Sequence, residues 1–163
     1  MRQRWRLPGV SATELLGAAL ARSCPWEQPG PRLLYLSGEL GAGKTTLAAA
    51  MLAALGVEEA VRSPSFALIE TYSLAQGVAV HVDCYRLQDS LELEQLGLRD
   101  YYAADTLWLV EWPERVAPAL PDPDLLLRLQ PEADGRGATI ETRTAAGAIW
   151  LAAVERIVKP DVE

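Results

Sequence analysis

The chain has 163 residues, a formal charge of −7 and 50% hydrophobic residues, which suits a single globular domain over residues 1–163. No apolar run reaches the roughly 18 residues that a membrane-spanning helix needs, and no apolar segment follows the basic N-terminus as in a secretory signal, so we expect a cytoplasmic protein that does not act at a membrane. The excess of acidic residues argues against direct binding of nucleic acid, which normally needs a basic face.

The first part of the chain predicts strands and helices in alternation. In chain order we expect an edge strand over residues 5–10, a helix over 11–22, a loop over 24–31, a buried strand over 33–37 and a helix over 45–55. Ser11 and Glu14 have the S-x-x-E spacing of a capping box, so the first helix should open there. The second helix is rich in alanine and leucine and should stop at Gly56.

The second part of the chain adds hairpins. We expect strands over residues 67–74 and 78–85 in a hairpin, a short acidic helix over 89–96 and a buried strand over 106–110. A proline-rich stretch over 113–123 should lead to two strands, over 125–130 and 138–143, joined by a turn. The last element should be a helix with one apolar face formed by Ile149, Trp150, Val154, Ile157 and Val158. Alternating strands and helices predict a layered α/β domain, and the tight hairpins predict a mixed, partly antiparallel sheet.

One motif carries most of the chemical information. Residues 38–45, GELGAGKT, match G-x-x-x-x-G-K-[ST] between a predicted strand and a predicted helix. Glycines let such a loop turn its amide groups toward phosphate oxygens, and the helix dipole adds positive potential. Lys44 should reach the β- and γ-phosphates, and the Thr45 hydroxyl should bind Mg²⁺. The motif therefore predicts Mg-ATP held by Gly41, Ala42, Gly43, Lys44, Thr45 and Thr46.

Two acidic residues are candidates to complete the magnesium site. Asp83 follows the predicted strand over 78–82, and Glu111 follows the one over 106–110. Magnesium prefers oxygen ligands, and a carboxylate at the end of a buried strand beside the phosphate loop is the usual source. Spacing alone leaves open which of the two binds the metal and which orients the attacking nucleophile.

Four segments together resemble one family. They are GELGAGKTT at residues 38–46, VRSPSF at 61–66, HVDCYR at 81–86 and EWPE at 111–114. In order and spacing they are similar to the TsaE (formerly YjeE) family, the bacterial P-loop ATPases of tRNA threonylcarbamoyladenosine (t6A) synthesis. Ser65 departs from the family's usual threonine but keeps the hydroxyl. The resemblance implies a three-layer P-loop NTPase-like α/β domain.

The resemblance also implies roles for individual residues. Lys44, Asp83 and Glu111 would be catalytic, Thr45 and Glu111 would bind the metal, and residues 63–66 would form a switch-like loop. Trp112, Thr13 and Arg136 would approach the nucleotide. We favour a simpler role for two of them, helix capping for Thr13 and a solvated hairpin charge for Arg136, and filling the core is the alternative for Trp112. We expect His81 to pack beside its strand, Arg86 to pair with Asp83, and Cys24 and Cys84 to be inert thiols.

Three functions fit these residues. The first, implied by the resemblance, is a Mg-ATP hydrolase that supports t6A modification through TsaD and TsaB proteins and reaches tRNA only indirectly. The second is a small-molecule kinase, which would need an acceptor pocket and a mobile arginine-rich lid. The third is a nucleotide-gated binding module with little turnover, in which ATP orders the loop at residues 63–66.

Overall fold

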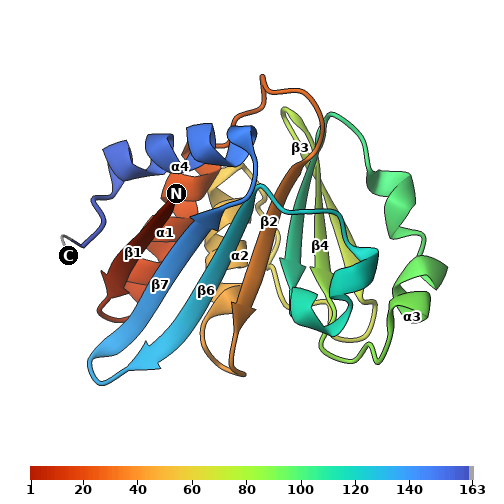
Figure 1. The fold of residues 1–163 in the computed structure, drawn as a ribbon, viewed down its shortest axis with the longest axis horizontal. Helices are drawn as coiled ribbons and strands as arrows, with labels where there is room; N and C mark the ends of the chain where they lie inside the picture. The colour runs from red at the N-terminus through yellow and green to blue at the C-terminus, as the bar shows by residue number, and fades with distance from the viewer. Residues whose placement is uncertain (162–163) are drawn as a thin grey trace.

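The computed structural model describes residues 1–161, which form a seven-stranded sheet with helices on both faces (Figure 1). The strands are β1 (Arg2–Leu7), β2 (Arg32–Gly38), β3 (Ile69–Leu74), β4 (Gly77–Asp83), β5 (Thr106–Glu111), β6 (Leu125–Glu132) and β7 (Gly135–Thr142). The α-helices are α1 (Val10–Arg22), α2 (Lys44–Ala54), α3 (Ser90–Gln95) and α4 (Ala145–Ile157), and the 3-10 turns are η1 (Leu98–Tyr101), η2 (Pro113–Arg115) and η3 (Ala117–Ala119).

The sheet is mixed, as the two hairpins predict. Its order is β1-β7-β6-β2-β5-β4-β3, in which β6, β2, β5 and β4 are parallel and the outer strands pair antiparallel. The carboxyl ends of β2, β4 and β5 therefore meet at one edge, where Gly38, Asp83 and Glu111 lie. The chain leaves β2 through α2 on one face of the sheet and leaves the adjacent β5 through η2 and η3 on the other face. Ligands of open α/β sheets bind outside the strand ends at such a point.

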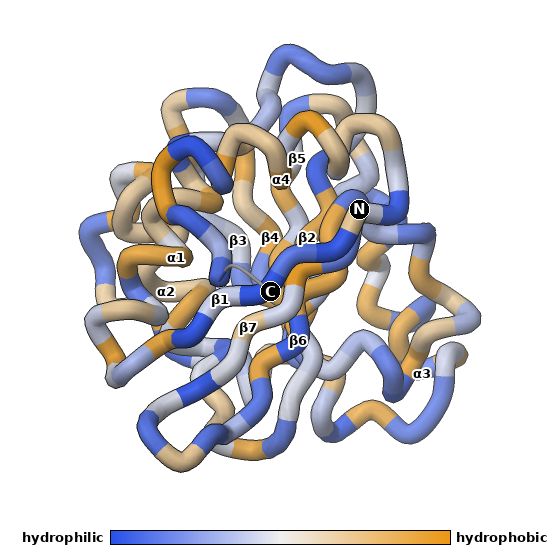
Figure 2. The backbone as a smooth tube through the Cα atoms, turned by 60° about the vertical axis from the view of Figure 1, so that its left-hand side comes forward, coloured by the Kyte–Doolittle hydropathy of each residue, from blue (hydrophilic) through white to orange (hydrophobic). Residues whose placement is uncertain are grey.

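Two apolar layers hold the helices to the sheet and confirm the three-layer architecture. On one face, α1, α2 and α4 pack against the sheet and one another through side chains such as Leu34, Leu47 and Trp150. On the other face, α3 and the 3-10 turns cover side chains such as Tyr35 and Trp108. Figure 2 shows hydrophobic colours along the central β2 and largely hydrophilic ones along the edge strand β1. Within residues 1–161, no helix is both long enough and apolar enough to span a membrane.

The N-terminal helix differs from its prediction. Helix α1 begins at Val10, directly after Gly9, whose φ of 87° sets the turn into the helix, and no side chain caps its amide groups. The predicted capping box of Ser11 and Glu14 is therefore wrong. The preceding strand β1 is an edge strand as predicted, but it lies three residues earlier, at Arg2–Leu7.

The predicted apolar face of the last helix is only partly right. Trp150 and Val154 of α4 are fully buried, together with Leu151, which was not predicted to face the core. Ile149 and Ile157 are about half exposed. Ile149 is turned about 100° away from Trp150, and Ile157 is the last residue of α4. The remaining strands and α-helices agree with prediction apart from shifts of a few residues at their ends, whereas the 3-10 turn η1 was not predicted.

The buried thiols give a first testable prediction. Burial raises the pKa of both Cys24 and Cys84 to about 12. Because the thiolate is the reactive form, we expect neither cysteine of the folded protein to react with a thiol reagent at about pH 8 within minutes, and both to react in denaturant. The absorbance of the coloured thiolate that a disulfide reagent releases measures how many cysteines have reacted. Fast modification of the native protein would contradict the burial of these residues.

Candidate phosphate-binding site

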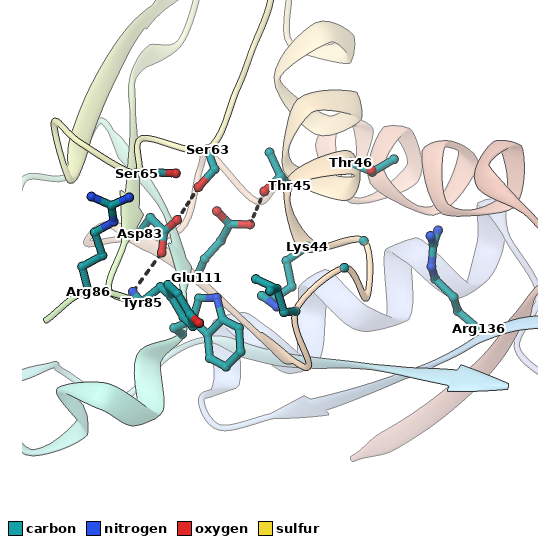
Figure 3. A pocket seen from close by; sticks show the side chains of 14 residues that line it. Lys44, Thr45, Thr46, Ser63, Ser65, Asp83, Tyr85, Arg86, Glu111 and Arg136 are labelled. Carbon is teal, nitrogen blue, oxygen red and sulfur yellow. Dashed lines mark hydrogen bonds between the residues drawn. The ribbon is translucent and has the colours of Figure 1, made fainter. Parts of the chain in front are cut away.

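A cavity of about 380 Å³ opens at the carboxyl edge of the parallel strands, directly over the G-x-x-x-x-G-K-T loop (Figure 3). The loop runs from the end of β2 into the start of α2. The cavity is lined by Leu40, Gly41, Gly43, Lys44, Thr45, Thr46, Ser63, Ser65, Asp83, Tyr85, Arg86, Glu111, Trp112 and Arg136. Residues from four separate stretches of the chain thus converge on the loop.

The glycines of this loop are required by its conformation. Gly43 caps α2 with φ 107°, and a Cβ there would lie 3.1 Å from the guanidinium of Arg136. Gly38 has φ 147°, and a Cβ there would lie 2.5 Å from the carbonyl oxygen of Leu129. Ala42 is almost fully buried in the core, so it can meet a phosphate only through its backbone. The glycines of the motif are therefore needed because residues with a side chain rarely adopt the backbone conformation found at these positions.

Lys44 is held at the base of the loop. Its Nζ donates hydrogen bonds to the carbonyl oxygens of Gly38 (2.7 Å) and Glu39 (2.9 Å), and it lies 4.1 Å from the ring centroid of Trp112. Burial lowers the pKa of Lys44, against the opposing effect of Glu111 and other nearby acids. A single buried ammonium is thereby placed where an anion in the cavity would meet it.

Thr45 and Glu111 contact each other across the cavity floor. The Thr45 hydroxyl donates to Glu111 Oε1 at 2.7 Å, and His81 Nε2 lies 3.2 Å from Glu111 Oε2. His81 is buried beside its strand as expected, but it also contacts this carboxylate. Burial alone raises the pKa of Glu111, whereas the contact with His81, the hydrogen bond from Thr45 and the charge of Lys44 lower it, and the net shift is downward.

This pair suits Mg²⁺ chemically. A hydroxyl and an ionised carboxylate are oxygen ligands, and Mg²⁺ keeps waters and substrate phosphates as its other ligands rather than filling an all-protein cage. Among residues 1–161 no group of three or more His, Cys, Asp and Glu side chains is placed to hold a metal ion. The donor set at Thr45 and Glu111 thus fits a metal that the nucleotide helps to bind.

Asp83 lies beside Glu111 but has different partners. The two residues are directly opposite each other in the parallel pair β4–β5. One oxygen of Asp83 accepts a hydrogen bond from the Ser63 hydroxyl and the other accepts one from the Tyr85 amide, at 2.9 Å (Figure 3). The carboxylate therefore connects the end of β4 to the loop at residues 61–66.

The predicted pairing of Arg86 with Asp83 is wrong. No ion pair joins them in the described part of the chain, and the Arg86 guanidinium lies over the ring of Phe66, 4.5 Å from its centroid. The backbone amide of Tyr85 and the hydroxyl of Ser63 already occupy the oxygens of Asp83. Arg86 is thus free to contact an exposed aromatic side chain at the cavity rim.

Aromatic and basic side chains form the cavity rim. Trp112 has φ 57°, an unusual backbone for a bulky residue, and its ring lies 4.9 Å from that of Tyr85. Arg136, from β7, reaches the loop and donates to the Thr13 hydroxyl at 3.3 Å. Thr13 itself is fully buried on α1 and does not line the cavity.

The residues expected at the site are thus largely brought together. Lys44, Thr45, Asp83, Glu111 and Trp112 surround one space, with Gly41, Gly43, Thr46 and Arg136 also on its wall, whereas Thr13 and the Ala42 side chain lie behind it. Sequence reasoning missed Tyr85 and Leu40 as wall residues. Their positions carry a signal, because Tyr85 is two residues beyond the strand-end acid Asp83 and Leu40 lies inside the glycine-rich loop.

The lowered pKa of Glu111 predicts a pH-dependent stability. Its folded pKa lies below the ordinary 4.5, so the stability it contributes is fully present above about pH 4.5 and is lost as pH falls through the folded value. We expect Glu111→Gln to reduce the free energy of unfolding at neutral pH, and by progressively less toward about pH 3. Urea unfolding of both proteins at each pH tests this. A difference independent of pH would contradict it.

Fold and loop together define the class of protein. The centre of the mixed sheet is parallel, G-x-x-x-x-G-K-T lies between a central strand and a helix, and acids lie at the ends of two neighbouring strands, which is the arrangement of a P-loop NTPase-like fold. The family described as "Threonylcarbamoyl adenosine biosynthesis protein TsaE" matches residues 7–140. The chain belongs to the TsaE family.

Individual relatives agree with this assignment. Proteins named tRNA threonylcarbamoyladenosine biosynthesis protein TsaE are similar to the chain: that of Haemophilus influenzae is 41% identical over 71% of this chain and 73% of its own, and that of Bacillus subtilis is 33% identical over 80% and 79%. The crystal structure of Bacillus subtilis YdiB superposes with a TM-score of 0.79 at 25% identity, over 96% of this chain and 95% of that one. The shared fold extends well beyond the four motifs.

Proposed function

We propose that this protein hydrolyses ATP with Mg²⁺ in the cytoplasm to support threonylcarbamoyladenosine modification of tRNA, and that it acts through TsaD and TsaB proteins rather than by binding tRNA itself. Membership of the TsaE family supports the process. The observation that carries the activity is the convergence of Lys44, Thr45, Asp83 and Glu111 on one cavity above a phosphate-type loop. The formal charge of −7 supports the indirect route to tRNA.

In this proposal each residue has a separate task. The amide groups of residues 41–46 and the Lys44 ammonium bind the phosphate oxygens and stabilise charge that develops on the γ-phosphate. Thr45 and Glu111 would hold Mg²⁺, which when bound supplies further neutralisation of that charge. The choice of Glu111 for the metal rests on its hydrogen bond with Thr45.

Asp83 is then the residue that orients the attacking water. Its two oxygens are held by Ser63 and by the Tyr85 amide, which fixes the carboxylate at the cavity wall without contact to Thr45. A carboxylate in that place can accept a hydrogen bond from water and orient it toward the γ-phosphate. The hydrogen bond from Ser63 also favours the gated-module alternative, because it joins the loop at residues 61–66 to a carboxylate on the cavity wall, and a bound nucleotide that held Asp83 in place would order that loop.

Phosphate release and product analysis test the proposal. We expect the protein with Mg-ATP to release inorganic phosphate into water, slowly alone and faster when TsaB and TsaD proteins from the same organism are added. Chelation of Mg²⁺ should abolish release. Transfer of the phosphoryl group to an added acceptor would indicate a kinase. Tight ATP binding with no release under any of these conditions would indicate the gated module instead.

A further inference from the structure

We infer that His81 is a positioning residue of this site: its Nε2–H holds one oxygen of Glu111 so that the other faces Thr45, and this sets how much Mg²⁺ the site requires. The inference rests on the proposed function, because it assigns a role within a magnesium-dependent nucleotide site. The hydrogen-bond pattern around Glu111 carries it.

The two oxygens of Glu111 have one donor each. Oε1 accepts from the Thr45 hydroxyl at 2.7 Å, and Oε2 lies 3.2 Å from Nε2 of His81. The His81 side chain is fully buried and that of Glu111 is 2% exposed, so no bulk water competes for either oxygen. A carboxylate held at both oxygens by side chains from two other elements, α2 and β4, has its plane and direction fixed.

The surroundings of His81 indicate which ring nitrogen carries the hydrogen. An ionised carboxylate accepts hydrogen bonds and cannot donate one. Nδ1 of His81 is buried and has no hydrogen-bond partner among the residues that the structure describes. A hydrogen on Nδ1 alone would leave Oε2 without a donor as well, so the contact requires the hydrogen on Nε2.

The contact between His81 and Glu111 matters most when nucleotide and Mg²⁺ occupy the site. The Thr45 hydroxyl can give a lone pair to a metal ion and still donate its hydrogen to Oε1, so the His81 contact would hold the second oxygen and complete the orientation of Glu111. Without His81, Oε2 would be a buried charged oxygen lacking a donor, and the carboxylate would rotate to find one. Within residues 1–161, no side-chain hydrogen bond joins His81 to the phosphate loop or to Lys44, so nucleotide binding without metal should not depend on it.

Three substitutions separate positioning from packing. His81→Leu removes the donor, and His81→Gln retains an N–H at a similar reach. Val82→Ala is the matched control: it removes buried volume from the next residue of β4, whose side chain packs on the opposite face of the sheet. The control should lose stability while it leaves the surroundings of Glu111 unchanged.

The role of His81 is tested by the binding of a non-hydrolysable ATP analogue. The affinity is measured over a series of Mg²⁺ concentrations and also in excess chelator. We expect His81→Leu to need about tenfold more Mg²⁺ for half-maximal binding, with affinity in chelator within about twofold of the unmodified protein. His81→Gln should recover most of the difference, and Val82→Ala should match the unmodified protein. A His81→Leu protein with unchanged Mg²⁺ dependence, or a Val82→Ala protein with the same loss, would overturn the inference.

A second readout needs neither nucleotide nor metal. His81 is the only histidine of the chain, so long-range ¹H–¹⁵N spectra contain one imidazole. We expect a hydrogen on Nε2 that exchanges slowly, and a large change of its resonance in Glu111→Ala. A hydrogen found only on Nδ1, or an unchanged resonance in that variant, would overturn the inference even if His81→Leu fails to fold. An unmodified protein that binds no nucleotide would refute the proposed function while this spectrum still reports the His81–Glu111 contact.

Discussion

Lys44→Ala is expected to abolish measurable ATP binding at micromolar concentrations. The ammonium is buried, lies at the base of the loop and is held there by two carbonyl oxygens. Removing one partner of a buried, hydrogen-bonded charge pair costs about 2–5 kcal/mol, or roughly 30- to 5,000-fold in affinity. Calorimetric titration with a non-hydrolysable ATP analogue measures the loss directly.

The chain provides its own control for this substitution. Lysine occurs only at Lys44 and Lys159, and Lys159 is exposed near the end of the described residues. Lys159→Ala should bind the nucleotide normally. Lys44→Arg should also fail, because a planar guanidinium does not fit where the compact ammonium contacts Gly38, Glu39 and Trp112. Normal affinity in Lys44→Ala would show that the phosphates lie elsewhere.

Glu111→Gln and Asp83→Asn are expected to impair turnover in two different ways. Each should lower the rate of phosphate release about 100-fold or more, as loss of a positioned polar group in an active site commonly does. Glu111→Gln should also raise the Mg²⁺ concentration needed for binding, because its oxygen contacts Thr45. Asp83→Asn should bind Mg-nucleotide within about threefold of normal, because its partners are Ser63 and the Tyr85 amide.

Steady-state turnover and nucleotide affinity, both measured across a Mg²⁺ series, separate the two effects. Glu94→Gln serves as the control, since Glu94 is half exposed on α3, on the opposite face of the sheet from α1 and α2. It should change neither quantity. If Asp83→Asn shifted the Mg²⁺ requirement and Glu111→Gln did not, the two roles would be exchanged. Full activity in both variants would remove the carboxylates from the mechanism.

The centre of the fold could be predicted because buried strands and glycine-terminated helices have strong local signals. β2 and β5 are continuous apolar runs, and α2 ends one residue from its predicted end, before Gly56. The ends of the chain were harder to predict. The start of α1 depends on the backbone of Gly9 rather than on a capping side chain, and the buried face of α4 depends on its packing against α1 and β7.

Some residues of the site could likewise be predicted from local sequence patterns, and others could not. Lys44 and Thr45 follow from the loop pattern, since adjacent residues at a helix start have fixed directions. Asp83 and Glu111 follow once β4 and β5 are neighbours in a parallel sheet. Contacts between distant elements have no local signal. The bond from Arg136 to Thr13 joins residues 123 positions apart, and the pairing of His81 with Glu111 depends on the register of two strands.

A crystal structure with Mg²⁺ and a non-hydrolysable ATP analogue tests the central claim most directly. The β-phosphate should lie within hydrogen-bond distance of the amide nitrogens of residues 41–46, with Lys44 Nζ moved from the carbonyl oxygens of Gly38 and Glu39 to the phosphates. A nucleotide bound at another surface, or a loop whose amide groups make no contact with any phosphate, would contradict the account.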